Sequence, residues 1–333
     1  MRNFDYLRPA TVAEAVAALD AHPRWQVLAG GTTMVDLLKL DVVEPEGLVD
    51  ITAIKDLEGW SVGPDALRFG ALARMADVAD DKAVRDACPA LTESLWKAAS
   101  QQLRNAARLG GNVLQRTRCP YFRDTSYACN KREPGTGCSA LQGGRTHLHA
   151  ILGGSSQCVA MYPGDWAQAL IAFDAVVLTA SSRGRRRIAF ADLHRLPGDR
   201  PHVETVLEPG EIITGIEVPI GRAMKASHYL KARERESYAF ATASAAVGLA
   251  LEGGVVADAR IALGGVAAKP WRAAAAEQSL RGKPFNEAAA REAGRIAFEG
   301  ATPLKESAYK IALGADVVAG ALMTAHERAL RTS

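Results

Sequence analysis

Apolar residues near the start of the chain follow helical and strand spacing in turn. Residues 11–22 (TVAEAVAALDAH) have helical spacing, and Thr11 followed by Glu14 predicts a capping box at the start of a helix. The runs 25–29 (WQVLA) and 47–52 (GLVDIT) predict short strands, and MVDLLKLD between them is expected to be helical or irregular. The N-terminal part is therefore predicted to mix helices with a sheet.

A different pattern begins after Val218-Pro219, so we expect a domain boundary near Arg222. From HYLKARE to ARIALGGVA, apolar residues alternate around turns, which is typical of an antiparallel sheet. The last segments, PFNEAAAREAGRIAFEGA and AYKIALGADVVAGALMTAHERAL, have helical spacing and are predicted to pack against that sheet.

Composition is that of an ordinary soluble chain of two or three domains, with 333 residues, 48% hydrophobic, 23% charged and a net charge of +3. No apolar run approaches the eighteen or so residues of a membrane span, so membrane insertion is not expected. The basic run Arg183–Arg187 is predicted to be a hairpin turn, not a nucleic-acid patch. The N-terminus lacks the apolar core and cleavage site of a secretory signal.

Four of the five cysteines crowd the stretch Gln115–Gln157 and its border, which shows neither the 3.6 nor the 2.0 apolar period. They are Cys119, Cys129, Cys138 and Cys158. A long loop without its own core can be held by a metal centre, and a thiolate set suits iron–sulfur or zinc. Disulfides and inert buried thiols remain alternatives. His147 and His149 could replace one cysteine as ligands, but both are expected to be exposed to solvent.

Two Gly-Gly segments carry further candidate chemistry. Gly30-Gly31-Thr32-Thr33 follows a predicted strand, and Gly110-Gly111-Asn112 follows a basic helix predicted over Gln101–Leu109. Adjacent glycines let backbone N–H groups point at a phosphate, and two such loops suit the pyrophosphate of a dinucleotide held from two sides. Neither segment matches G-x-G-x-x-G, which argues against a Rossmann site.

These segments carry a resemblance that spans nearly the whole chain. LAGGTTMVDLLK, LGGNV, MYPGDWAQALIAFDAVVLTA, EPGEIITGIEVP and YLKARERESYAFATASAAVGLAL resemble, in order, the FAD-binding medium subunit of the xanthine dehydrogenase (molybdenum hydroxylase) family. Pro163-Gly164-Asp165 stands where most members carry a Ser-Pro-x-Ser-Asp-like segment, and an insertion at about 115–160 precedes it. The insertion is similar to the flavin subunit of periplasmic aromatic aldehyde oxidoreductase and, more loosely, of 4-hydroxybenzoyl-CoA reductase, both of which carry an additional [4Fe-4S] cluster.

The resemblance implies an α+β fold, with a two-subdomain FAD-binding domain over 1–222 and a smaller C-terminal α+β domain over 223–333. It implies a [4Fe-4S] cluster on the four clustered cysteines. It also implies FAD contacts from Ala29, Gly30, Gly31, Thr32, Thr33, Met34, Gly110, Gly111, Asn112, Asp165, Ile213, Thr214 and Lys231. In these roles the glycine segments hold the pyrophosphate, Asp165 lies near the ribityl chain, Ile213 and Thr214 line the ring or adenine pocket, and Lys231 reaches the flavin. Taken alone, Asp165 is as readily a helix N-cap and Lys231 a solvated strand lysine.

As to function, the resemblance implies an electron-transfer subunit that binds no organic substrate itself. Its expected partners are a molybdenum–pterin large subunit and a [2Fe-2S] small subunit, in a heterotrimer that delivers electrons to an external acceptor. NAD-reducing members carry a different loop around FADLHRLPGD, so NAD is not implied. Two other classes fit the same residues, a zinc-stapled nucleotide-binding module and a stand-alone flavoprotein oxidase. We expect a cytoplasmic location, or a periplasmic one reached by export with a signal-bearing partner.

Overall fold

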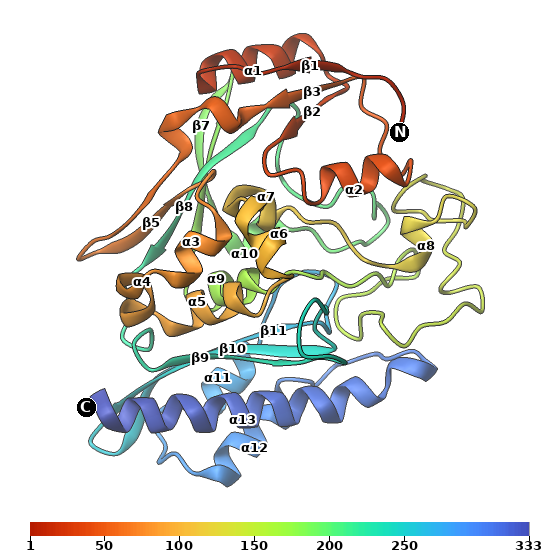
Figure 1. Ribbon diagram of the computed structural model, residues 1–333. Helices are drawn as coiled ribbons and strands as arrows, with labels where there is room; N and C mark the ends of the chain where they lie inside the picture. Colours follow the sequence, from red (N-terminus) through yellow and green to blue (C-terminus); the bar gives the residue numbers. More distant parts are fainter. Residues whose placement is uncertain (333) are drawn as a thin grey trace.

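A computed structural model describes residues 1–332 as three sheets with helices between and below them (Figure 1). The N-terminal part contains β1 (Asp5–Leu7), α1 (Val12–Ala21), β2 (Trp25–Leu28), α2 (Met34–Lys39) and β3 (Gly47–Asp50). Its strands form a parallel sheet in the order β1-β3-β2. The predicted capping box is confirmed, since the Thr11 hydroxyl accepts from Glu14 N and the Glu14 carboxylate accepts from Thr11 N. Short 3-10 turns at Ile51–Ala53 and Lys55–Leu57 follow.

The middle of the molecule is a five-stranded antiparallel sheet in the order β4-β5-β8-β6-β7. Its strands are β4 (Trp60–Val62), β5 (Ala66–Gly70), β6 (Val176–Ser181), β7 (Gly184–Ala189) and β8 (Ile212–Pro219). The helices that accompany it are α3 (Met75–Asp80), α4 (Lys82–Ala87), α5 (Pro89–Trp96), α6 (Gln101–Ala106), α7 (Leu109–Val113), α8 (Pro120–Arg123), α9 (Trp166–Ala172) and α10 (Phe190–Leu193). The largest buried cluster lies between this sheet and α3, α5 and α9. The basic run forms the β6–β7 hairpin, with Arg183 at the turn, as predicted.

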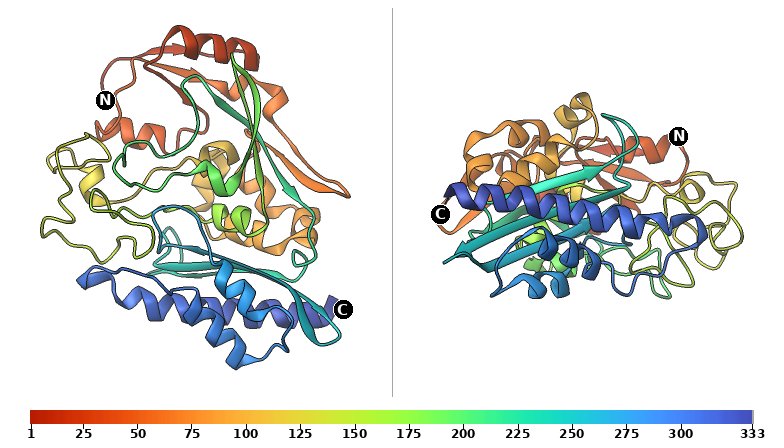
Figure 2. Two further views of the ribbon diagram at one scale, coloured as in Figure 1. Left: turned by 180° about the vertical axis from the view of Figure 1, so that it is seen from behind. Right: turned by 90° about the horizontal axis from the view of Figure 1, so that it is seen from below.

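The C-terminal part is an antiparallel sheet in the order β12-β11-β10-β9 with helices on its lower face. Its elements are β9 (Ser227–Ala232), β10 (Ala243–Glu252), β11 (Val255–Gly264), β12 (Trp271–Arg272), α11 (Ala274–Leu280), α12 (Glu287–Ile296), a 3-10 turn at Lys305–Ser307 and α13 (Tyr309–Thr332). The view from below shows α13 lying across the strands (Figure 2). The antiparallel sheet and the two helices predicted for this part are confirmed. We keep the proposed domain boundary at Arg222, which lies between β8 and β9.

One C-terminal segment meets a length and composition criterion for a membrane span, although Asp316 interrupts its apolar residues. Among the described residues, Lys305–Arg331, which cover nearly all of α13, are long and apolar enough by length and composition to cross a membrane, with a mean hydropathy of 1.3. In the fold α13 packs against β9, β10 and α12. Contact with the sheet therefore explains why one helix carries so many apolar residues.

A partly buried carboxylate joins the middle and C-terminal parts. Glu93 on α5 accepts hydrogen bonds from His228 Nδ1 at 2.8 Å, from Tyr229 N at 2.8 Å and from Arg328 Nη2 at 2.6 Å. Burial by itself would raise the pKa of Glu93, but the hydrogen bond and charge of His228, together with Arg328, lower that pKa to about 2. The two parts of the chain are thus joined by an ionised side chain.

Candidate functional site

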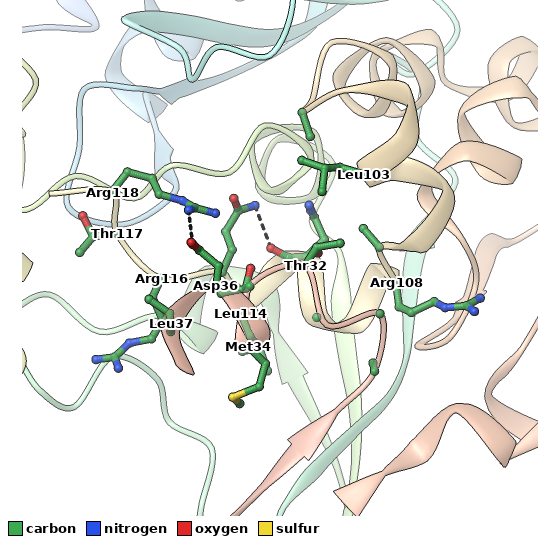
Figure 3. A pocket seen from close by; sticks show the side chains of 18 of the residues that line it. Thr32, Met34, Asp36, Leu37, Leu103, Arg108, Leu114, Arg116, Thr117 and Arg118 are labelled. Atoms are coloured by element: carbon green, nitrogen blue, oxygen red, sulfur yellow. Dashed lines mark hydrogen bonds and ion pairs between the residues drawn. The ribbon is translucent and has the colours of Figure 1, made fainter. Parts of the chain in front are cut away.

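A cavity of about 1070 Å³ opens between the N-terminal part, the middle sheet and the C-terminal part. Its wall comes from the segment after β2, from α6 and α7, from the insertion, from the start of β8 and from the loop 234–242 before β10. Figure 3 shows Thr32, Met34, Leu103 and Leu114 around this space, with Arg118 reaching Asp36 at one end. A cavity of this size is large enough for a dinucleotide cofactor.

The first glycine segment lies on the cavity wall, as predicted, from Ala29 to Met34. In the described part of the chain the backbone N–H groups of Gly31, Thr32 and Thr33 have no protein acceptor. These donors precede the first turn of α2, where a helix leaves N–H groups free for an anion. Gly30 has a different reason to lack a side chain, because a Cβ there would lie 2.1 Å from the Ala106 carbonyl oxygen. The segment therefore offers three unpaired N–H donors to an anion in the cavity.

The second glycine segment also lies on the wall, but the expectation of a loop was wrong. Residues 109–113 form the short helix α7, whose Leu109 and Val113 are buried in the main core. Gly110 N donates to Ala71 O at 2.9 Å and is not available to a ligand. Gly111 N has no protein acceptor among residues 1–332, and a Cβ on Gly111 would meet nothing within 4 Å. Of this pair, Gly111 is the residue that faces the open cavity.

Asn112 adds an unpaired polar atom to the same wall. Its Oδ1 is buried and has no hydrogen-bond partner, while its Nδ2 lies 3.3 Å from the Met75 sulfur. An orphaned buried acceptor is uncommon in native structures, and it calls for a ligand or an ordered water. The backbone contact predicted for Asn112 is not available, because its N–H donates to Arg108 O at 2.8 Å, and the polar atom that Asn112 offers to the cavity is the acceptor Oδ1.

Asp165 lies on the cavity wall and is buried. It occupies the N-cap position of α9, but its side chain makes no capping hydrogen bond. Instead Oδ1 accepts from the Tyr229 hydroxyl at 2.6 Å and Oδ2 accepts from Lys231 Nζ at 2.9 Å. Burial raises the pKa of Asp165, against the opposing influence of Lys231 and Tyr229. The carboxylate is thereby fixed in orientation by two side chains of β9.

Lys231 and Thr214 are not among the residues that line the cavity. The Lys231 side chain is fully buried, outside the cavity wall, and its Nζ also donates to Lys97 O. The alternative of a solvated strand lysine is wrong, because the side chain is fully buried, whereas contact of Lys231 with a flavin stays a prediction. Ile213 lines the cavity, whereas Thr214 turns away and donates from Oγ1 to Leu178 O, because successive strand residues face opposite sides.

The insertion supplies cavity residues that the sequence interpretation missed. Arg118 Nη1 donates to Asp36 at 2.7 Å, and Arg123 donates to both Asp36 oxygens at 2.7 and 2.9 Å. The Arg123 hydrogen bond, with help from Arg118, lowers the pKa of Asp36. Arg118 Nε is buried without a partner, and its guanidinium lies over the Phe240 ring at 5.0 Å. The sequence signal was the alternation of arginines next to Cys119, in QRTRC.

The four clustered cysteines come together in the structure. Cys119, Cys129, Cys138 and Cys158 line one small buried pocket of about 10 Å³ with the apolar side chains of Phe122, Ala128, Ala140 and Ala160. All five cysteines of the chain are free thiols, and Cys88 lies elsewhere, 3.5 Å from the Ser227 hydroxyl. Within residues 1–332, no group of three or more His, Cys, Asp or Glu side chains is arranged to hold a single metal ion.

The donor set of this pocket fits an iron–sulfur cluster in kind, since four thiols converge and no carboxylate does. Its space is the size of a water molecule, so the sulfur atoms must move apart to admit four irons. Burial raises the pKa of Cys119 to about 12 and that of Cys158 to about 11. Thiolates would therefore form here only with a compensating cation.

Hydrogen bonds brace the insertion around the thiol pocket. Asn130 Oδ1 accepts from Gly135 N and Gly137 N, and Asn130 Nδ2 donates to Gln157 O. Arg132 Nη1 donates to the carbonyls of Tyr121 and Phe122 at 2.8 and 2.9 Å. A small cluster of Leu37, Val42, Phe122 and Cys129 packs the insertion onto α2. The insertion thus has some core of its own, which its irregular sequence did not predict.

The two histidines of the insertion differ in burial. His147 is exposed as expected, but the expectation for His149 was wrong, because its side chain is 3% exposed. His149 Nε2 lies 3.3 Å from Cys119 Sγ. Burial lowers the pKa of His149 to about 4, with Lys310 adding to the effect, so its ring is neutral near pH 7.

Comparisons with known proteins agree with this geometry. Residues 2–221 match the family described as the FAD binding domain in molybdopterin dehydrogenase, and residues 228–325 match the CO dehydrogenase flavoprotein C-terminal domain. The chain is 40% identical to the aldehyde oxidoreductase FAD-binding subunit PaoB of Escherichia coli strain K12, over 99% of this chain and 100% of that protein. It is 28% identical to the carbon monoxide dehydrogenase medium chain of Hydrogenophaga pseudoflava, over 98% of each chain.

Solved structures of related proteins have the same fold over nearly the whole chain. A quinoline 2-oxidoreductase from Pseudomonas putida 86 matches with a TM-score of 0.76 and 25% identity, covering 98% of this chain and 99% of that chain. The carbon monoxide dehydrogenase of Hydrogenophaga pseudoflava also matches with a TM-score of 0.76, at 28% identity and 98% coverage of both chains. The fold and the cavity define an FAD-binding subunit of an oxidoreductase. The chain belongs to the family of FAD-binding medium subunits of molybdenum hydroxylases.

Proposed function

We propose that this chain is the FAD- and [4Fe-4S]-containing electron-transfer subunit of a molybdenum-dependent aldehyde oxidoreductase. The observation that carries the finer part of this proposal is that the four cysteines of the insertion line one buried pocket beside the large cavity. The 40% identity to an aldehyde oxidoreductase subunit supports the aldehyde class over carbon monoxide or purine substrates. In this proposal the organic substrate is bound by a partner chain.

Several residues would hold FAD. Gly31, Thr32, Thr33 and Gly111 would donate backbone N–H groups to the pyrophosphate, since these donors lack protein acceptors. Asp165, oriented by Tyr229 and Lys231, would accept from hydroxyl groups of the cofactor. When bound, FAD supplies a carrier that exchanges electrons singly with iron–sulfur centres and in pairs with other partners.

Other residues would fix the insertion against the flavin cavity. Arg118 and Arg123 hold Asp36 on α2, the helix that begins where the first glycine segment ends. Movement of the insertion is therefore linked mechanically to the segment that would hold the pyrophosphate. We infer that an intact insertion supports FAD retention as well as cluster binding.

For partners, we propose a heterotrimer with a molybdenum–pterin large subunit and a [2Fe-2S] small subunit, and an external electron acceptor. The supporting observation is the full-length similarity to medium chains of carbon monoxide dehydrogenase and glyceraldehyde dehydrogenase. Co-expression with the neighbouring subunits and size-exclusion chromatography would test this assembly. Recovery of this chain as a stable, flavin-loaded monomer that turns over aldehydes alone would support a stand-alone oxidase instead.

The cluster is tested by exchanging single cysteines in the whole complex. Cys129→Ser and Cys138→Ser should each remove or convert the [4Fe-4S] signal in electron paramagnetic resonance, because a serine oxygen is a harder ligand than a thiolate. Cys88→Ser is the matched control and should leave the signal intact, since Cys88 lies outside the thiol pocket. An unchanged signal in both insertion variants would refute the ligand assignment. A single zinc in place of iron would favour the zinc-stapled module.

A further inference from the structure

Two residues form the wall between the flavin cavity and the thiol pocket. Cys119 and His149 line both of these spaces, whereas the other three clustered cysteines line only the thiol pocket. A cluster held by the four thiols would therefore come nearest to the flavin cavity on the side of Cys119. This shared wall belongs to the insertion, which lies beside α2 (Figure 1).

The position of His149 relative to Cys119 is well defined. Its Nε2 lies 3.3 Å from Cys119 Sγ, within hydrogen-bond range for sulfur. The ring stacks on Tyr121, with centroids 6.0 Å apart and planes 26° apart, and His149 N donates to Thr146 O at 3.0 Å. The other ring nitrogen, Nδ1, is buried without a partner in the described part of the chain.

The direction of this hydrogen bond follows from the chemistry of the sulfur. A cysteine bound to iron is a thiolate, which has no proton to give, so the imidazole nitrogen must be the donor. Hydrogen bonds to the sulfur atoms of an iron–sulfur cluster favour its reduced form, which carries one more negative charge. A donor on one sulfur also makes that side of the cluster the better-stabilised site for the added electron.

We propose that His149 is a positioning residue that donates a hydrogen bond from Nε2 to the Cys119 sulfur and thereby raises the reduction potential of the cluster. The same hydrogen bond marks the side of the cluster from which electrons pass to and from the flavin. The inference rests on the proposed cluster. In such a transfer one electron leaves one centre and reduces the other across the Cys119–His149 wall. No further oxidant or reductant is needed.

The test compares variants of the intact three-subunit complex by redox titration of the cluster, followed by electron paramagnetic resonance. His149→Phe keeps a flat ring but removes the donor, and His149→Gln keeps a donor. His147→Ala is the matched control, because His147 lies two residues away and is exposed, and its backbone carbonyl, which accepts from Tyr309, is kept in the variant. Iron and flavin content are measured on every sample.

We expect His149→Phe to lower the cluster potential so that the ratio of reduced to oxidised cluster at fixed solution potential falls roughly tenfold, about 59 mV for one electron. His149→Gln should restore most of the shift, and His147→Ala should cause none. An intact cluster with an unchanged potential in His149→Phe would overturn the inference. Loss of iron from both His149 variants would also overturn it, because a hydrogen-bond donor can be replaced by another donor.

Failure of the underlying proposal gives a different result. A wild-type complex without a [4Fe-4S] signal attributable to this chain would refute the cluster itself and, with it, the role of His149. A wild-type cluster whose potential does not respond to His149 would leave the cluster in place and refute only the inference. Measuring iron content and the reduction potential of the cluster therefore distinguishes failure of the proposed cluster from failure of the inference about His149.

Discussion

Gly111 offers a sharp test of the flavin site, because it is a glycine with no structural need to be one. It lies in helix α7, has no positive φ, and a Cβ added there would meet no protein atom within 4 Å. The same position lines the large cavity. A side chain at residue 111 would therefore occupy cofactor space without disturbing the protein.

A side chain at residue 111 should stabilise the flavin-free protein but weaken its binding of FAD. Gly111→Ala should stabilise the flavin-free chain by up to about 1 kcal/mol, the helix-propensity difference between glycine and alanine. Overpacking against bound FAD should cost about 1–3 kcal/mol, which corresponds to roughly 5- to 150-fold weaker binding. Gly111→Val should weaken binding further, since a β-branched side chain has little freedom to turn aside.

The assay is a titration of the flavin-stripped complex with FAD, followed by flavin fluorescence, alongside thermal unfolding of the flavin-free samples. The control is Gly282→Ala in the C-terminal part, a position that also has open space for a Cβ but lies away from the cavity. Because Gly282 has a positive φ, its variant should lose stability and keep FAD affinity. Wild-type FAD affinity in Gly111→Val would refute the placement of the pyrophosphate.

Two further predictions concern the buried charges. The folded pKa of Glu93, about 2, lies below its ordinary 4.5, so its contribution of at most about 3 kcal/mol is full above pH 4.5 and is lost as pH falls towards 2. Glu93→Gln should therefore destabilise the protein at pH 6 more than at pH 3 in chemical unfolding; an equal loss at both pH values would contradict the assignment. Lys231→Met should leave Asp165 buried without its cation and cost about 3–5 kcal/mol. Adding Asp165→Asn should recover part of that loss in thermal unfolding, and a fully additive double variant would argue against the pair.

Much of the fold could be predicted from patterns of residues that lie close together in the sequence. The capping box at Thr11 and Glu14, the β6–β7 hairpin and the long C-terminal helix each depend on residues close together in the chain. The strand order of the middle sheet does not depend on neighbouring residues alone. Strand β8 lies between β5 and β6, and its position is set by packing between segments far apart in the chain. Helix α7 was missed because two glycines in five residues have low helix propensity, and burial of Leu109 and Val113 outweighs it.

The residues of the candidate site could be predicted from the sequence, but the contacts that their side chains make could not. The glycine segments and the four cysteines were found from residue type and clustering alone. The contacts of Lys231 could not be found in this way, because its partner Asp165 lies 66 residues earlier in the chain. His149 was missed for a similar reason, since in the motif His-x-His only the fold decides which ring is buried.

The central claim is that this chain carries both FAD and a [4Fe-4S] cluster. Its most direct test is to purify the complex without oxygen and to quantify flavin, iron and acid-labile sulfide, with the partner subunits measured separately. We expect one releasable FAD and a four-iron cluster to remain with this chain. A chain that retains FAD but holds no iron or sulfide, with its four clustered cysteines reactive as free thiols, would contradict it.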